Sequence, residues 1–185
     1  MKKAVFGFFV FCSLAAVPAF AWAGHATYHI GPGDTLEISV WKDATLSRQV
    51  VVPPDSIISF PLIGDIDVGN MTVAKLRKTV AKKLSEYIPD ATVTVMLVKI
   101  ASLQAYVIGK VKRPGQFAIT LDTDVMQILA MAGGMTPFAS ESNIIILRRQ
   151  DNKITKIPFD YKEVEKGKNL AQNIILQRGD VVVVP

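Results

Sequence analysis

The sequence YHIGPGDTLEISVW, residues 28–41, decides how the chain begins to fold. Apolar and polar side chains alternate from Leu36 to Val40, which is the pattern of a strand with one buried face. This stretch follows Gly31-Pro32-Gly33-Asp34, where glycine permits backbone angles closed to other residues and proline fixes one φ angle. The motif therefore predicts a tight turn that leads into a half-buried strand.

The chain after this motif alternates between short strand patterns and one helical pattern. Four turn formers separate the apolar stretches of residues 50–68: Pro53, Pro54, Pro61 and Gly64. This punctuation favours short strands joined by turns. From Thr72 the apolar residues are spaced by three and four, so we expect an amphipathic helix that Thr72 caps, that continues to Ile88 and that Pro89 ends. A further strand is expected at residues 93–97.

The second half repeats this mixture of strands and short helices. We expect strands at residues 106–108, 117–119, 144–147, 154–157 and 181–184, and helices from about Thr123 and from Tyr161. Gly133-Gly134 should end the first of these helices, since glycine adopts the left-handed cap conformation without penalty. Pro114-Gly115 and Gly179-Asp180 mark turns. The predicted fold class is therefore α+β, with two small mixed domains at residues 24–100 and 101–185.

The first 23 residues have the features of an export signal. Lys2 and Lys3 precede an apolar run from Ala4 to Val17, which is too short for a membrane span. Small residues then allow cleavage after Ala21 or after Ala23, and the sequence favours neither site. We expect residues 1–23 to be a cleaved signal peptide and the remaining chain to be periplasmic.

Cys12 is the one cysteine of the chain, and it follows Phe11. A lipoprotein would carry a small residue before its acylated cysteine, so we expect no lipid here. Cleavage after residue 21 or 23 would also remove Cys12, which would exclude disulfides and cysteine-based metal sites from the processed protein.

Candidate catalytic and metal-binding groups are sparse. His25 and His29 are the histidines of the processed chain, and they lie near its start in sequence that reads as extended, so a metal site is not favoured. Gly31-Pro32-Gly33 precedes a strand and not a helix, unlike a phosphate-binding loop. We expect no bound metal and no cofactor.

Two pairs of acids could in principle serve glycoside cleavage, which needs two carboxylates on either side of the scissile bond. Asp65 and Asp67 should share one side of a strand, and Asp122 and Asp124 precede a helix whose dipole favours acids there. The structural interpretation is therefore preferred for both pairs, and the sequence predicts no enzyme.

Charge and aromatic content limit the possible partners. The formal charge is +5, but the bases are scattered among acids, which disfavours a nucleic-acid partner. Four aromatic residues could stack on sugar rings: Tyr28, Trp41, Tyr87 and Tyr106. Their wide spacing favours core positions over a sugar-binding surface.

The glycine and proline motifs together resemble a known family. Residues 28–41 closely resemble the opening motif of the polysaccharide-export domain, and residues 52–58 and 60–66 resemble its next blocks, with Ser56 where that family usually has glycine. The second half resembles a soluble-ligand-binding β-grasp (SLBB) domain. The motif residues, for which the resemblance implies a structural role, are Gly31, Gly33, Asp34, Trp41, Pro61, Gly64, Gly109, Pro114, Gly115, Gly133, Gly134, Gly179 and Asp180.

This resemblance implies a non-enzymatic component of a capsule or exopolysaccharide export channel, associated with the outer membrane. Copies would form a homo-oligomeric ring that conducts the glycan, together with an inner-membrane co-polymerase or chain-length regulator. Larger relatives carry a lipidated N-terminus, further β-grasp domains and a C-terminal amphipathic helix. We therefore expect a short form that relies on a separate outer-membrane β-barrel protein. A monomeric periplasmic glycan-binding or sensing module is the alternative, and the sequence does not identify the glycan.

Overall fold

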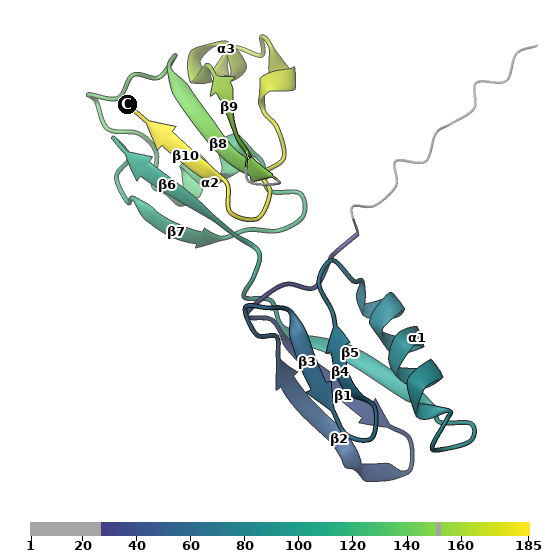
Figure 1. Ribbon diagram of the computed structural model, residues 1–185. Coiled ribbons are helices and arrows are strands. Elements are labelled where there is room, and N and C mark those ends of the chain that lie inside the picture. The colour runs from purple at the N-terminus through teal and green to yellow at the C-terminus, as the bar shows by residue number, and fades with distance from the viewer. Residues whose placement is uncertain (1–26, 151–152) are drawn as a thin grey trace, which may run out of the picture.

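The computed structural model describes residues 27–150 and 153–185, which form two α+β domains joined by a short segment after β5 (Figure 1). The predicted fold class, α+β with two small mixed domains, is confirmed. Each domain has its own cluster of buried apolar side chains, one within residues 30–95 and the other within residues 105–184. The expected signal peptide and its cleavage sites lie outside the described residues.

The first domain is a three-stranded antiparallel sheet with a hairpin and one helix (Figure 1). Its elements are β1 (Thr35–Val40), β2 (Asp43–Val51), β3 (Ile57–Phe60), β4 (Gly64–Asp67), α1 (Val73–Leu84) and β5 (Val93–Lys99). The order in the sheet is β2-β1-β5, and β3 pairs with β4 in a separate hairpin. The strand predicted from the opening motif is therefore the central strand of this sheet.

Alternation along β1 fixes which of its faces is buried. Leu36, Ile38 and Val40 are buried, and the residues between them are partly exposed. Because side chains of a strand point alternately to opposite faces, this pattern places every apolar residue of β1 in the core. The expectation of a half-buried strand is confirmed.

Helix α1 begins where predicted and ends earlier. The Thr72 hydroxyl accepts a hydrogen bond from the Lys75 amide at 3.1 Å, as a capping residue should. The helix ends at Leu84 and not near Ile88, because Ser85 directs its hydroxyl to the Lys82 carbonyl at 2.7 Å and the chain leaves in a turn. Ile88 still packs against the first core from this turn, which explains why the helical spacing extends beyond the helix.

The second domain is a five-stranded mixed sheet with two short helices. Its elements are β6 (Gln104–Gly109), β7 (Gly115–Ala118), α2 (Val125–Met131), β8 (Ile144–Gln150), β9 (Lys153–Phe159), α3 (Tyr161–Glu165), a 3-10 turn at Leu170–Gln172 and β10 (Val181–Val184). The order is β7-β6-β10-β8-β9. The C-terminal strand β10 lies parallel to β6 and antiparallel to β8, so the last residues of the chain complete the centre of the sheet.

Helix α2 has well-defined ends. Asp124 and Gln127 form a capping box, in which the Asp124 carboxylate accepts from the Gln127 amide at 2.8 Å and the Gln127 side chain accepts from the Asp124 amide at 3.1 Å. At the other end, the amides of Gly133 and Gly134 donate to helix carbonyls. Both glycines have positive φ, so they end the helix as the sequence predicts. Within the described residues, no helix combines the length and the apolar character needed to cross a membrane.

Candidate functional site

The segment that opens the first domain also makes the junction between the two domains. Asp34 is 0% exposed, and its carboxylate accepts four hydrogen bonds. Oδ2 accepts from the Tyr28 hydroxyl and, at 2.8 Å, from the Gly31 amide. Oδ1 accepts from the amides of Ala101 and Ser102 at 3.0 and 2.9 Å. One buried carboxylate therefore ties the start of the first domain to the segment that leads into the second.

These contacts change the ionisation of both side chains. Burial alone would raise the pKa of the Asp34 carboxyl, but the hydrogen bonds from Tyr28, Gly31 and Ser102 outweigh it and hold the pKa below its usual value. Burial and the hydrogen bond to Asp34 raise the pKa of the Tyr28 hydroxyl to about 12. At neutral pH Asp34 is therefore ionised and Tyr28 is a neutral donor.

A second contact comes from the far end of the chain. The Arg178 guanidinium donates to the His29 carbonyl at 2.8 Å. It also lies directly over Gly31, where an added Cβ would be only 1.9 Å from Arg178 Nη1. Gly31 is buried, and a side chain there would displace the guanidinium end of Arg178 from its place against His29.

A cleft of about 470 Å³ opens beside this junction. Residues of both domains line it, among them Tyr28, Asn70, Leu103, Ile175 and Arg178. A second hollow of about 400 Å³ shares Arg178 and lies next to β8, β9 and β10. The cleft combines apolar walls with a few polar groups, which is the composition of a site for a small ligand or a saccharide unit.

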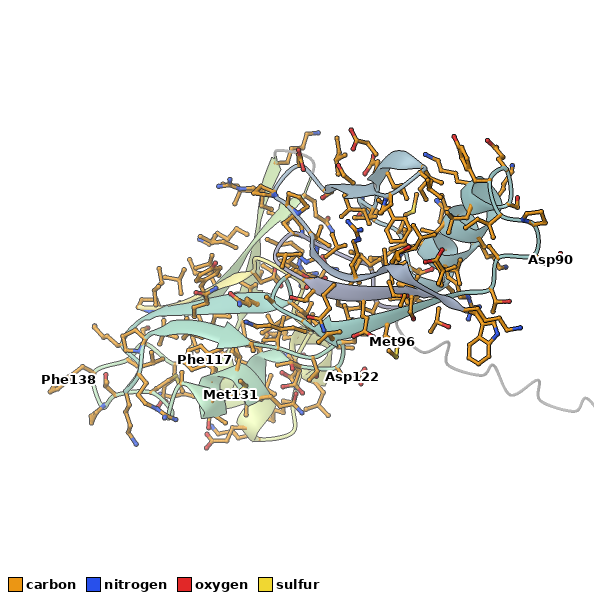
Figure 2. The ribbon with its side chains drawn as sticks, turned by 90° about the horizontal axis from the view of Figure 1, so that it is seen from below. Asp90, Met96, Phe117, Asp122, Met131 and Phe138 are labelled. Carbon is orange, nitrogen blue, oxygen red and sulfur yellow. The ribbon has the colours of Figure 1, made fainter. Side chains whose placement is uncertain are left out.

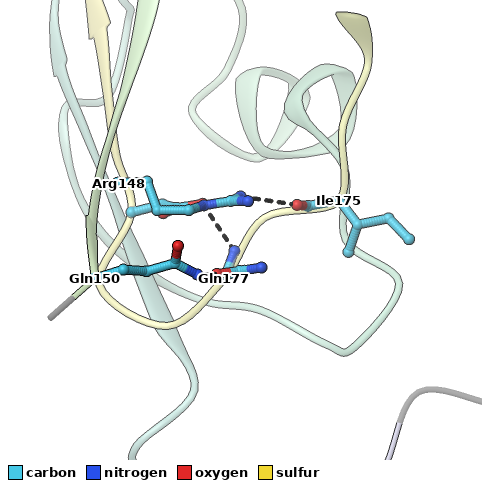
Figure 3. A network of polar contacts seen from close by, with 5 residues as sticks. Arg148, Gln150, Ile175 and Gln177 are labelled. Carbon is cyan, nitrogen blue, oxygen red and sulfur yellow. Dashed lines mark hydrogen bonds and ion pairs between the residues drawn. The ribbon is translucent and has the colours of Figure 1, made fainter. Parts of the chain in front are cut away.

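The turn before β10 is held by a second buried carboxylate. Asp180 is 0% exposed and pairs with Arg148 at 2.7 Å, and it also accepts from the Gln177 amide at 2.8 Å. Figure 3 shows how Arg148 lies between this turn and the Ile175 carbonyl, to which it donates at 3.0 Å. Every polar group in this buried network has a partner, so it acts as a structural clamp on the sheet.

The motif residues predicted from the sequence fall into separate places. Gly31, Gly33 and Asp34 meet at the domain junction. Three other motif residues lie on the surface of the first domain: Trp41, Pro61 and Gly64. The remaining motif residues belong to the second domain: Gly109, Pro114, Gly115, Gly133, Gly134, Gly179 and Asp180. At Gly109 an added Cβ would lie 2.0 Å from the Val184 carbonyl oxygen. The motif residues are thus distributed over the turns of the fold and do not converge on one pocket.

The preference for core positions of the aromatic residues was wrong for three of them. Trp41 is 72% exposed, Tyr87 58% and Tyr106 39%. Trp41 lies in the turn after β1, Tyr87 in the turn after α1, and Tyr106 on the exposed face of β6. Tyr28 is partly buried at the junction. The three exposed rings lie on different parts of the chain, after β1, after α1 and on β6.

Three of the four paired acids have structural roles, and Asp122 is exposed. Asp65 accepts from the Ser59 hydroxyl across the β3–β4 hairpin, Asp67 accepts from the Gly69 amide, and Asp124 caps α2. No group of three potential metal ligands occurs among residues 27–150 and 153–185. His25 lies outside the described residues, and His29 takes part in the junction through its backbone carbonyl.

Sequence reasoning missed three participants in the junction. Ser102 lies between the domains and Arg178 in the last turn, and neither belongs to a pattern that points to Asp34. Tyr28 was considered for its ring, whereas its hydroxyl makes the contact. Of the junction residues, Gly31, Gly33 and Asp34 stood out, as part of the opening motif.

Two comparisons with known proteins cover most of the chain. Residues 23–98 match the family described as polysaccharide biosynthesis/export protein, and residues 103–184 match the SLBB domain. The chain is 26% identical to the polysialic acid transport protein KpsD of Escherichia coli, over 85% of this chain and 28% of that protein. It is 29% identical to the EPS I polysaccharide export outer membrane protein EpsA of Ralstonia nicotianae, over 85% of this chain and 47% of that protein.

A third relative is the capsule polysaccharide export outer membrane protein CtrA of Neisseria meningitidis, with 24% identity over 88% of this chain and 45% of that protein. The chain therefore spans less than half of the length of each of these curated relatives. The aligned region contains both domains described above.

Proposed function

Because the chain belongs to the polysaccharide-export family, we propose that it is a non-enzymatic component of a machine that carries a capsular or extracellular polysaccharide across the cell envelope. The observation that carries this proposal is the order of the two matched domains, an export domain at residues 23–98 followed by an SLBB domain at residues 103–184. The family is a transport family, and KpsD, EpsA and CtrA are each named for the transport or export of a polysaccharide.

The proposed working form is a homo-oligomeric ring in the periplasm. A ring needs a head-to-tail interface that closes on itself, and every copy must present its two halves of the interface at the same angle. The Asp34 hydrogen bonds and the contact of Arg178 with His29 hold the junction between the domains, which supports a fixed presentation. An inner-membrane co-polymerase or chain-length regulator and a separate outer-membrane β-barrel are the proposed partners.

A conduit should contact its glycan weakly, because tight binding would slow transit. The scattered exposed rings of Trp41, Tyr87 and Tyr106 fit brief contacts better than a dedicated sugar site. The basic residues of α1, which include Lys75 and Lys78, offer a further solvated surface along the first domain.

Deletion and complementation in the native host would test the export role. We expect deletion to remove the glycan from the cell surface while polymer accumulates inside, and expression of the wild-type chain to restore surface glycan. Quantification of the polysaccharide in surface and periplasmic fractions measures both effects. Unchanged surface glycan in the deletion strain would reject the proposal, and native mass measurement on membrane extracts would test the ring.

The junction cleft favours a second candidate function, a monomeric glycan-binding or sensing module. Its volume of about 470 Å³ and the guanidinium of Arg178 suit one saccharide unit. Calorimetry with fragments of the exported glycan distinguishes the two functions. Tight one-to-one binding by a monomer would support the module, whereas weak binding by an oligomer would support the conduit.

A further inference from the structure

One end of the second domain carries an aromatic side chain with almost no protein around it. Phe138 is 81% exposed and belongs to the loop between α2 and β8. Figure 2 shows this ring at the end of the second domain that points away from the first domain. At this exposure the ring faces solvent.

The backbone below this ring is well anchored. The Thr136 amide donates to the Lys110 carbonyl at 2.9 Å, and Val111 and Met135 form an isolated antiparallel bridge. The Ser140 amide donates to the Pro185 carbonyl at 2.6 Å on the other side of the loop. These bonds fix both ends of the loop, so its geometry presents the ring outward and offers it no place in the core.

Three exposed bases lie on the segment that pairs with the start of this loop: Lys110, Lys112 and Arg113. The Lys110 carbonyl accepts from the Thr136 amide, and the Lys112 amide donates to the Gly134 carbonyl at 3.0 Å. Arg113 donates to the Met131 carbonyl at 2.9 Å and so lies at the C-terminal end of α2. Residues 110–113 and 132–140 contain these three bases and no acid. Glu141, the next acid along the loop, pairs with Lys162 at 3.5 Å.

An exposed aromatic ring on a loop whose start pairs with a basic segment matches the chemistry of an anionic bilayer surface. Apolar side chains such as phenylalanine insert at the boundary between headgroups and acyl chains, and basic residues are attracted to anionic headgroups. A protein partner would have to supply a concave apolar pocket for Phe138, whereas a deformable bilayer needs none. We propose that the tip formed by Phe138, Lys110, Lys112 and Arg113 docks on a membrane leaflet that contains phosphatidylglycerol. This proposal does not depend on the export function.

Vesicle sedimentation with the processed full-length protein tests the proposal. We expect binding to vesicles of equal parts phosphatidylglycerol and phosphatidylcholine, little binding to pure phosphatidylcholine, and weakening by added salt. Phe138→Ala should lower the partition coefficient about tenfold, since an apolar side chain is no longer buried. The pair Lys110→Gln and Lys112→Gln should lower it about 25-fold, at roughly fivefold for each charge. Arg113 is left unchanged because it also caps α2.

Matched controls come from the first domain. Trp41→Ala removes another exposed ring, and the pair Lys75→Gln and Lys78→Gln removes two exposed bases of α1. Neither control should alter binding, and circular dichroism should show all variants folded. Absence of binding to the anionic vesicles, or equal losses in controls and tip variants, would overturn the proposal. Crosslinks from a photoreactive residue at position 138 to a protein and not to lipid in cells would also overturn it.

Discussion

Replacement of the buried carboxylate at the domain junction should weaken the fold more than any exposed acid-to-amide change. In Asp34→Asn one oxygen becomes an NH2 group, which cannot accept hydrogen bonds. In the wild-type protein, Oδ1 accepts from the amides of Ala101 and Ser102, and Oδ2 accepts from the Tyr28 hydroxyl and the Gly31 amide. Whichever way the amide turns, one pair of donors loses its acceptor.

The size of the effect follows from these lost bonds. A hydrogen bond to a charged group contributes about 1.5 to 3 kcal/mol, and a buried donor without a partner costs about 1 to 3 kcal/mol. Local relaxation and the two bonds that remain will offset part of this. We therefore expect Asp34→Asn to lower the free energy of unfolding by about 2 to 4 kcal/mol.

The pH dependence gives an independent signature. The folded-state pKa of Asp34 lies below its ordinary value of 3.8, so the unfolded chain takes up the proton first as pH falls. The stability that the carboxylate contributes is therefore complete above pH 3.8 and is lost as pH falls through the folded-state pKa. The difference in unfolding free energy between wild type and Asp34→Asn should be constant near neutral pH and should shrink in acid.

Urea unfolding followed by circular dichroism measures this difference, and amide hydrogen exchange at Ala101 and Ser102 localises it. Exchange at one of the donor pairs should accelerate in the variant. Asp122→Asn is the control, since this side chain is exposed and accepts no hydrogen bond from residues 27–150 and 153–185, so the change should alter stability by less than about 0.5 kcal/mol. A difference between Asp34→Asn and wild type that is no larger than that of the control at neutral pH would refute the reasoning.

Three further changes test other parts of the fold. Gly109→Ala should destabilise the second domain by about 3 kcal/mol or more in thermal unfolding. The new Cβ would lie 2.0 Å from the Val184 carbonyl oxygen, and residue 109 has a φ of 97°, which favours glycine. A stability equal to wild type would contradict this prediction. Arg148→Met should cost about 3 to 5 kcal/mol in urea unfolding, since Asp180 would keep a buried charge without its partner, and adding Asp180→Asn should restore part of the loss. Ser56→Gly should raise the stability of the first domain by about 0.5 to 1 kcal/mol. Ser56 has a φ of 62°, and the relief of this left-handed strain should exceed the entropy cost of glycine. A melting temperature below that of wild type would count against this prediction.

The local elements of the fold were largely predictable from the sequence. Alternation in β1, the Thr72 cap and the glycines after α2 each depend on neighbours within a few residues, and the structure confirms all three. The end of α1 was predicted too late, because the apolar spacing that continues to Ile88 serves packing in a turn as well as in a helix. Apolar spacing thus defined the buried face better than the helix boundary.

The junction was not predictable in the same way. Asp34 meets Ser102 across 68 residues and His29 meets Arg178 across 149, and no periodic pattern encodes a contact at such a separation. The exposed positions of Trp41 and Phe138 also escaped prediction, since an isolated aromatic residue gives no signal of which face of the fold it will occupy.

The buried carboxylate at Asp34 has a consequence for the order in which the two domains fold. Its donors come from Tyr28, Gly31, Ala101 and Ser102, so all four are available as soon as the chain through Ser102 is free to fold. The first domain can thus complete its core before any strand of the second domain exists. The contact between Arg178 and His29 needs the second domain through Arg178, so it can close the junction only after the first domain is able to fold, and it joins two halves that mature at different times.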